Sequence, residues 1–224
     1  MQTETNDPAQ ARKHVFLVDD HPLVRERLCQ LIDREPDLAV CGEAEDGPQA
    51  FAAILEARPS AVVVDISLKS SHGLELIRDL QQQVPGLPIL VLSMHKESLY
   101  ALRALRAGAL GYISKVEPSG EVLNALRRVI DGQVYLSVAM KERVVSGQVG
   151  RKQDTSDPVD RLSDRELEVF QFLGRGFGTR RIAVELHIGI KSVEAYRARL
   201  KAKLGASDAT ELLFHAIQWV HSLK

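Results

Sequence analysis

Two adjacent carboxylates follow the first apolar run of the chain. In the stretch HVFLVDDHPLVRERL, which starts at His14, the run to Val18 predicts a short buried strand, and Asp19 and Asp20 come directly after it. Neighbouring acids repel each other, and both are costly to remove from water unless a positive charge lies between them. Taken alone, this stretch fits a solvated surface turn as well as it fits one half of a cation site.

Three later apolar runs each lead to a side chain that could complete such a site. AVVVDI carries Asp65, PILVLS ends at Ser93, and LGYIS is followed directly by Lys115. If these runs are strands of one parallel sheet, their carboxyl ends share one edge, which is where ligands bind in such sheets. Three carboxylates would then meet one hydroxyl and one ammonium. The acids favour a hard divalent ion such as Mg²⁺, and the single Lys provides a positive charge for an anion.

The elements that must position these residues alternate between strand-like and helix-like segments. Such alternation predicts a parallel sheet of five strands covered by helices on both faces. Continuous apolar runs such as AVVVD and ILVLS are typical of central parallel strands. The expected strands cover residues 14–19, 38–44, 61–66, 88–93 and 110–114, and the expected helices cover residues 22–35, 47–58, 73–83, 98–108 and 119–132.

The chain changes character near residue 132. Residues 132–160 are polar and contain Gly, Ser and Pro, which predicts a linker that could open with a helix over residues 138–145. Every later segment is helical, over residues 162–174, 179–187, 191–205 and 208–224. Residues 161–224 hold 11 Lys and Arg against 7 Asp and Glu, a net charge of +4, whereas the preceding residues carry −5. This asymmetry indicates that the C-terminal part meets a polyanion.

The acidic residues and their neighbours resemble the receiver domain of two-component response regulators. The matching stretches are VDD, VVVDISL, LVLS and GYISK, and the resemblance extends over roughly residues 15–131. It implies a flavodoxin-like (βα)5 receiver over residues 14–131, preceded by a disordered tail over residues 1–13. It also implies that Asp65 accepts a phosphoryl group from a sensor histidine kinase.

The resemblance further implies a metal site beside Asp65. Asp20, supported by Asp19 and Asp65, would hold Mg²⁺, and the backbone carbonyl of Ser67 would complete the site. An enzyme alternative is a phosphohydrolase of the haloacid-dehalogenase type, which also uses Asp, Ser or Thr, Lys and Mg²⁺. That class needs a second Asp two residues after the nucleophile, where this chain has Ser67, and no cap domain is evident. We therefore expect that the protein is not an enzyme.

Three more residues receive roles from the same resemblance. Lys115 and the Ser93 hydroxyl would bind phosphate oxygens, and the Tyr112 ring would turn inward when Ser93 moves. The chain departs from the family in two loops. It reads LK where many receivers have Met-Pro after the phosphoacceptor strand, and Val116 replaces the Pro that often follows the Lys, so no cis-Pro is implied there.

The basic helical part resembles the LuxR-type helix-turn-helix of the NarL/FixJ subfamily over residues 161–224. Ser163 and Glu166 predict a capping box at its first helix, and HIGIK is the expected turn of the motif. In the expected recognition helix over residues 190–204, Val193, Leu200 and Leu204 fall on one face and should be core. The expected DNA-facing residues of this helix and its supporting helix are Arg180, Lys191, Ser192, Glu194, Ala195, Tyr196, Ala198, Arg199 and Lys203.

Individual contacts follow from side-chain chemistry. Arg199 could read guanine, Glu194 could accept a hydrogen bond from cytosine, and Ala195 could touch a thymine methyl. Ser192 and Lys203 flank this face and suit phosphates. The family often has Ser-Glu where this chain has Gly and Ile before the recognition helix, and its frequent His is Tyr here, so base specificity need not follow the family.

The two halves together predict a phosphorylation-dependent transcription regulator. A sensor histidine kinase would phosphorylate Asp65, and a homodimer would then bind two-fold operator DNA, with RNA polymerase as a further candidate partner. The alternative is a DNA-binding regulator that works without phosphorylation and carries a vestigial receiver. The polar start MQTETNDPAQARK lacks the apolar segment of a signal peptide, and no apolar run is long enough to span a membrane, so we expect a cytoplasmic protein.

Overall fold

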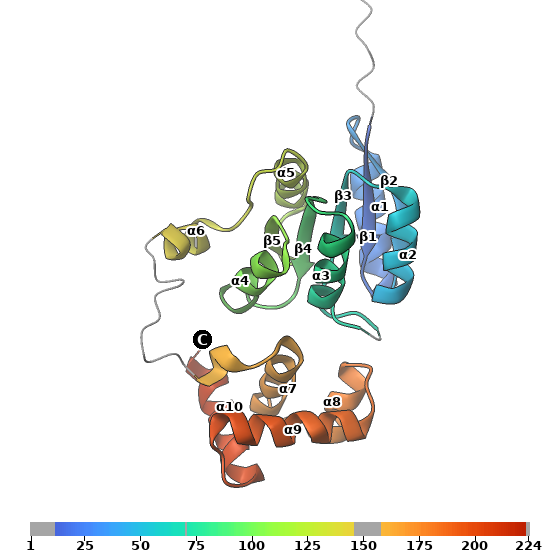
Figure 1. Cartoon of the computed structure of the whole chain (residues 1–224). Helices are drawn as coiled ribbons and strands as arrows, with labels where there is room; N and C mark the ends of the chain where they lie inside the picture. The colour runs from blue at the N-terminus through green and yellow to red at the C-terminus, as the bar shows by residue number, and fades with distance from the viewer. Residues whose placement is uncertain (1–11, 70, 146–157, 223–224) are drawn as a thin grey trace, which may run out of the picture. The chain divides into compact units, whose positions relative to one another are not determined.

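The computed structural model describes residues 12–69, 71–145 and 158–222 (Figure 1). These residues form two compact units that divide between Ser137 and Val138. Most of the expected tail, residues 1–11, and the middle of the expected linker, residues 146–157, lie outside the described residues. No helix within the described ranges is long and apolar enough to cross a membrane.

The first unit is built on a parallel sheet with the strand order β2-β1-β3-β4-β5. The apolar runs become strands because their side chains are buried on both faces, as all four residues of β3 are. The strands are β1 (Lys13–Val18), β2 (Leu38–Ala44), β3 (Ala61–Val64), β4 (Ile89–Ser93) and β5 (Gly111–Ser114). The flavodoxin-like (βα)5 architecture is therefore confirmed.

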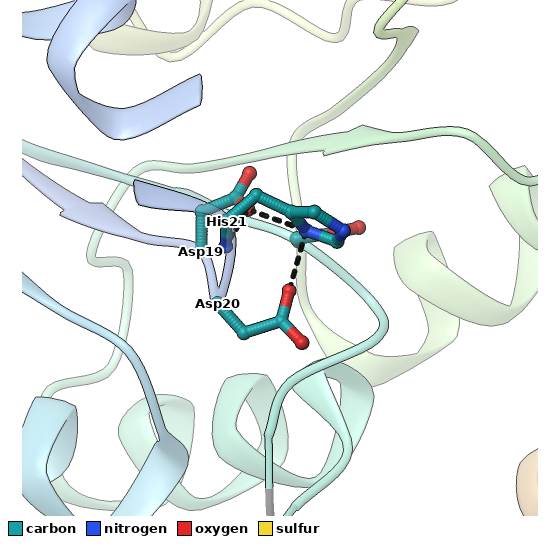
Figure 2. Close-up of side chains that lie close together, drawn as sticks. Asp19, Asp20 and His21 are labelled. Atoms are coloured by element: carbon teal, nitrogen blue, oxygen red, sulfur yellow. Dashed lines mark hydrogen bonds and ion pairs between the residues drawn. The ribbon is translucent and has the colours of Figure 1, made fainter. Parts of the chain in front are cut away.

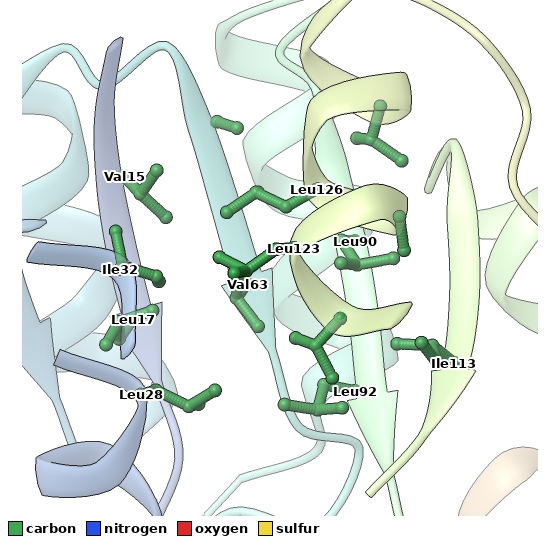
Figure 3. Packing of buried hydrophobic residues seen from close by; sticks show 14 of the residues in the cluster. Val15, Leu17, Leu28, Ile32, Val63, Leu90, Leu92, Ile113, Leu123 and Leu126 are labelled. Carbon is green, nitrogen blue, oxygen red and sulfur yellow. The ribbon is translucent and has the colours of Figure 1, made fainter. Parts of the chain in front are cut away.

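Helices cover both faces of this sheet (Figure 1). Helices α1 and α5 pack on one face, where Leu28 and Ile32 of α1 and Leu126 of α5 meet Leu17 and Val63 of the strands (Figure 3). Helices α2, α3 and α4 lie on the other face. The bounds are α1 (Pro22–Asp33), α2 (Gly47–Ala57), α3 (Gly73–Gln83), α4 (Glu97–Ala107) and α5 (Ser119–Ile130).

The first unit extends beyond residue 131, where we expected the receiver to end. Tyr135 forms a parallel bridge to Gly111 at the outer edge of β5. Its N–H donates to Leu110 O at 3.0 Å, and its carbonyl accepts from Tyr112 N–H at 2.9 Å. These hydrogen bonds occupy the open edge of the sheet, so residues 132–137 belong with the first unit.

The second unit consists of helices. It holds α6 (Val138–Val145), the 3₁₀ turn η1 (Pro158–Arg161), α7 (Asp164–Gly174), α8 (Thr179–Glu185), α9 (Ile190–Leu204) and α10 (Ala209–Ser222). Helix α6 covers residues 138–145, where the sequence allowed a helix at the start of the expected linker. The turn between α8 and α9 includes His187 with φ of 51°, a left-handed conformation that Gly adopts more easily.

Helix α9 packs against the others through the apolar positions that its periodicity predicts. Val193 and Leu200 are fully buried, as expected. Leu204 is only half-buried, because it lies at the last turn beside an open pocket lined by Phe170 and Trp219. The helix ends at Gly205, whose φ of 69° gives a left-handed C-cap.

Candidate functional site

The acidic residues come together because β1 and β3 are neighbours in the sheet. Val18 pairs with Val64, so Asp19 and Asp65 each follow their strand at the same edge. The Asp65 N–H donates to Val18 O at 2.8 Å, which fixes the two strand ends against each other. Both carboxylates are buried, Asp19 with 3% and Asp65 with 4% of the residue exposed. The sheet therefore brings two carboxylates together and removes both from water, which is costly unless a positive charge lies between them.

Lys115 supplies the positive charge that this pair needs. Its Nζ lies 2.6 Å from Asp65 Oδ2 and 2.6 Å from Asp19 Oδ2. Burial acts to lower the pKa of the Lys115 ammonium, but the carboxylates of Asp65 and Asp19 outweigh burial, so this pKa is raised above its usual value. The other oxygen of Asp65, Oδ1, accepts a hydrogen bond from Ile66 N–H at 2.6 Å. Each oxygen of Asp65 thus has a donor that orients it.

Asp20 and His21 follow Asp19 in the chain, and the three side chains lie close together (Figure 2). The His21 Nδ1 atom is 2.6 Å from Asp20 Oδ1 and 3.3 Å from Asp19 Oδ1. Burial raises the pKa of the Asp20 carboxyl above its usual value, His21 opposes this, and the nearby Asp65 and Asp19 carboxylates add to the increase. Asp20 is therefore a carboxylate whose ionised form lacks enough compensating positive charge.

This donor set fits a divalent cation. One ligand atom from each of Asp19, Asp20, His21 and Asp65 lies within 4.8 Å of the others. Clustered carboxylate oxygens are the ligands that Mg²⁺ prefers, and a cation there would reverse the unfavourable environment of Asp20. Ser67, the fourth expected metal ligand, lies in the loop after β3, where its Oγ is 2.9 Å from His95 Nε2. His21 was not among the expected ligands.

Ser93 and Tyr112 lie in adjacent strands next to the acidic pocket. Ser93, at the end of β4, is 1% exposed, and its partner in β5 is Ser114, directly before Lys115. The Tyr112 hydroxyl donates to His95 O at 2.7 Å. Tyr112 is completely buried. Burial raises the pKa of its hydroxyl, with a further increase from Asp65.

Besides His21, two further residues near Asp65 were not predicted. His95 bridges loops, because its ring contacts Ser67 while its backbone carbonyl holds Tyr112. Gly73 begins α3 so close to the Asp65 carbonyl oxygen that a Cβ at residue 73 would collide with it. A Gly at the start of a helix is a weak signal, and nothing in the spacing of the His residues points to a contact between loops, so sequence reasoning had little chance of finding either.

The second unit presents α9 as a largely exposed helix. The predicted DNA-facing residues that are exposed are Arg180, Lys191, Ser192, Glu194, Ala195, Ala198, Arg199 and Lys203, and Tyr196 is half-buried. The Arg199 guanidinium lies 4.5 Å from the centre of the Tyr196 ring. Arg197 Nη1 donates to Thr179 Oγ1 at 2.6 Å, which ties α9 to the start of α8. The small side chains Ala195 and Ala198 leave room for close approach to a groove.

Two domain families match the chain. Residues 15–127 match the response regulator receiver domain, and residues 160–216 match the luxR family of bacterial regulatory proteins. The oxygen regulatory protein NreC of Staphylococcus epidermidis is 30% identical over 210 residues, which cover 91% of this chain and 96% of NreC.

Solved structures agree with these matches. A LuxR-family two-component response regulator from Aurantimonas sp. SI85-9A1 has a TM-score of 0.58 and 34% identity over 62% of this chain and 99% of its own. RcsB from Salmonella enterica serovar Typhimurium, solved bound to promoter rprA with the phosphomimetic BeF3−, has a TM-score of 0.59 and 25% identity over 92% of this chain and 98% of its own.

The acidic edge of the parallel sheet and the exposed helix α9 thus belong to two recognised domains in one chain. These families are DNA-binding regulators of transcription and not enzymes. This protein belongs to the two-component response regulators of the NarL/FixJ subfamily, with a receiver domain followed by a LuxR-type helix-turn-helix domain.

Proposed function

We propose that a sensor histidine kinase phosphorylates Asp65 and that the phosphorylated chain binds operator DNA as a dimer through α9. The observation that carries this proposal is the contact of Lys115 Nζ with Asp65 Oδ2 at 2.6 Å in a pocket that two further carboxylates share. A buried acid with an ammonium at its reactive oxygen and a cation site beside it suits phosphoryl transfer, which depends mainly on positioning and neutralisation of charge. We propose a role for each residue of this site.

In the transfer, a carboxylate oxygen of Asp65 attacks the phosphorus of a phosphohistidine. The new O–P bond forms as the P–N bond breaks, and the imidazole leaves. Ile66 N–H holds Asp65 Oδ1, so the carboxylate keeps its orientation during the attack. Lys115 then moves its ammonium from the carboxylate to a phosphoryl oxygen, and the Ser93 hydroxyl donates to another.

Asp19, Asp20 and Asp65 would hold Mg²⁺, with the backbone carbonyl of Ser67 as a further ligand. A bound divalent ion supplies neutralisation of the charge on the phosphoryl oxygens. The residues fit this ion because carboxylate oxygens dominate the cluster. Asp20 gains most, since burial and its acidic neighbours disfavour its ionised form.

Phosphorylation adds nearly two negative charges beside Ser93. Ser93 and Tyr112 are linked through the loop after β4, because the His95 N–H is 3.4 Å from Ser93 Oγ and the His95 carbonyl holds the Tyr112 hydroxyl. A phosphoryl group that draws in the Ser93 hydroxyl therefore favours one arrangement of this loop. We assign the shift between monomer and DNA-binding dimer to this change.

The DNA-binding residues are those on the exposed side of α9 and the start of α8. Lys191 and Ser192 suit phosphates, while Glu194, Ala195 and Ala198 lie on the side that would face bases. The exposed apolar side chains of α10, Leu213 and Phe214, support a dimer contact. We place the protein in the cytoplasm, where it would meet its kinase, its DNA and, as a further partner, RNA polymerase.

The alternative, a vestigial receiver, has less support because the residues that phosphoryl transfer needs are all present and adjacent. The test is intact-mass analysis after incubation with Mg²⁺ and acetyl phosphate, comparing the wild type with Asp65→Ala. We expect the mass of one phosphoryl group on the wild type alone. Phosphorylation of neither protein, with acetyl phosphate and with a phosphoramidate as donors, would favour the vestigial receiver.

A further inference from the structure

The second unit contains a buried carboxylate that joins two helices. Glu166, in the first turn of α7, is 2% exposed. Its Oε2 accepts a hydrogen bond from the Ser163 N–H at 2.8 Å, and its own N–H donates to Ser163 Oγ at 3.4 Å, which completes the predicted capping box. In a capping box the carboxylate accepts a hydrogen bond from the N-cap N–H of its own helix. Here the carboxylate is buried and has partners outside α7.

Those partners are basic residues of α9. Lys203 Nζ lies 2.6 Å from Glu166 Oε2, and Arg199 Nε lies 3.4 Å from Glu166 Oε1. Lys203 Nζ also donates to Arg161 O at 3.4 Å. Burial works against ionisation of Glu166, but the hydrogen bonds from Lys203 and Ser163 outweigh burial, so the pKa of this carboxyl is below its usual value. The Glu166 carboxylate is thus charged, and both of its oxygens have partners.

The two basic residues were expected to contact DNA, and their surroundings differ from those of Lys191. Lys203 Nζ donates to a buried carboxylate and to Arg161 O, so a Lys203 that moved away to a phosphate would give up these hydrogen bonds. Leaving Glu166 buried and unpaired would be costly. Lys191, in the first turn of α9, is exposed, and no charged partner is seen for it among the described residues. Lys191 therefore suits a phosphate contact, whereas Lys203 is already paired with Glu166.

We infer that Glu166 is a positioning residue for DNA binding, and that Lys203 holds α9 against α7 through Glu166 rather than contacting a phosphate. The Arg199 guanidinium has its Nε beside Glu166 and lies over the Tyr196 ring, and no partner among the described residues is seen for its two terminal nitrogens, which could contact DNA. This inference rests on the proposed DNA binding through α9. Lys203, which was predicted to contact DNA, becomes a residue that positions α9. Glu166 is added as a residue that supports DNA binding without touching the DNA.

The salt dependence of DNA binding separates the two roles of a Lys. Each phosphate contact adds close to one unit to the slope of log K against log salt concentration. The experiment measures this slope for the full chain on a fixed synthetic duplex of mixed sequence, for wild type, Lys203→Met and Lys191→Met. We expect Lys191→Met to reduce the slope by about one unit. Lys203→Met should leave the slope unchanged and weaken binding by roughly tenfold at every salt concentration, because α9 is no longer held in place.

Further variants keep the test decisive. Lys203→Arg retains the ion pair with Glu166 and should restore most of the affinity. Glu166→Gln should weaken binding as Lys203→Met does, and the double variant should be no worse than either single one. Circular dichroism confirms that each variant is folded at the assay temperature, and Lys203→Met still decides the matter if Glu166→Gln fails to fold.

Other outcomes would overturn the inference. A slope reduced by about one unit in Lys203→Met would make Lys203 a phosphate contact. Unchanged affinity in a folded Lys203→Met protein would make the pair a matter of stability alone. If the wild type itself does not bind the duplex at low salt, the proposed DNA binding has failed, and this failure is distinct from the other two.

Discussion

Lys115 Nζ lies 2.6 Å from Asp65 Oδ2, at the oxygen that we propose receives the phosphoryl group. The two residues come from different strands that β4 separates, so only the folded sheet can bring them together. Their contact is buried, with 7% of the Lys115 side chain and 4% of the Asp65 side chain exposed. The ammonium thus serves the stability of the receiver as well as its chemistry.

Lys115→Met should therefore destabilise the receiver. Without the ammonium, the carboxylates of Asp65 and Asp19 are buried without a countercharge, and we expect a loss of roughly 3 kcal/mol in the free energy of unfolding. Urea unfolding followed by far-UV circular dichroism measures this loss. In an Asp65→Asn background the same change should cost less, because one of the two carboxylates is already gone. Equal costs in both backgrounds would show that the pair is not coupled.

Asp20→Asn should stabilise the receiver in the absence of Mg²⁺ at neutral pH. The folded-state pKa of Asp20 is raised, so its contribution to stability is fully present below the unfolded-state pKa and is lost as the pH rises through the folded-state value. At neutral pH the residue is ionised at a cost, and Asn removes that cost. Thermal unfolding at acidic and neutral pH, for wild type and variant, measures the difference. A variant that melts below the wild type at neutral pH would contradict the account.

Bound Mg²⁺ should remove the same cost of holding Asp20 ionised in the folded receiver. At about 100 times its dissociation constant, Mg²⁺ should add about 2.7 kcal/mol to the stability of the wild-type receiver. Asp20→Asn should lose most of this increase, since a neutral amide is a poorer ligand for a hard cation. Melting temperatures with and without Mg²⁺, with Ca²⁺ as a comparison ion, give the measurement. An equal increase in the variant would place the metal elsewhere.

The second unit should lose stability in acid through Glu166. Because the folded-state pKa of Glu166 is lowered, its contribution is present above the unfolded-state pKa and is lost as the pH falls through the folded-state value. Trp219 is the only Trp of the chain and lies in α10, so its fluorescence reports this unit alone. Lys203→Met should flatten the pH dependence of urea unfolding below about pH 4.5. A variant with the wild-type profile would show that the pair does not control this response.

His187→Gly should stabilise the same unit. His187 adopts a φ of 51° in the turn between α8 and α9, and a residue with a Cβ is strained there. Gly relieves the strain at some cost in chain entropy, so we expect a gain of about 0.5–1 kcal/mol. Urea unfolding followed by Trp219 fluorescence checks it, with Ala at the same position as the control that keeps the strain. A Gly variant no more stable than the Ala variant would refute the explanation.

Local patterns predicted much of the fold. The apolar run before Asp65 predicted a buried strand. The spacing of Ser163 and Glu166 predicted the start of α7, and the capping box confirms it. The parallel sheet then followed from the alternation of elements, and with it the meeting of Asp19, Asp65 and Lys115 at one edge. Local patterns could not predict individual contacts between elements, because such contacts leave no periodic signal in the sequence.

Two residues illustrate this limit. Tyr135 lies in a polar segment that predicts a linker, yet its backbone pairs with the edge of β5. An edge strand has unpaired N–H and C=O groups, and a nearby segment can pair with them whatever its side chains are. Lys203 lies on the flank of α9 where a phosphate contact is the natural expectation. Its partner, Glu166, is 37 residues away in the sequence, and only the packing of α9 against α7 reveals it.

We propose that phosphorylation of Asp65 controls DNA binding by α9. The most direct test selects genomic fragments with the phosphorylated wild-type chain and then measures Kd for a selected fragment, with and without acetyl phosphate and Mg²⁺, for wild type and Asp65→Asn. We expect roughly tenfold tighter binding by the phosphorylated wild type, which is within the range of coupling between two sites, together with a dimeric mass in light scattering. The variant should not respond to acetyl phosphate. Equal affinity of phosphorylated and unphosphorylated wild type for the fragment, with the same mass in both states, would contradict the claim.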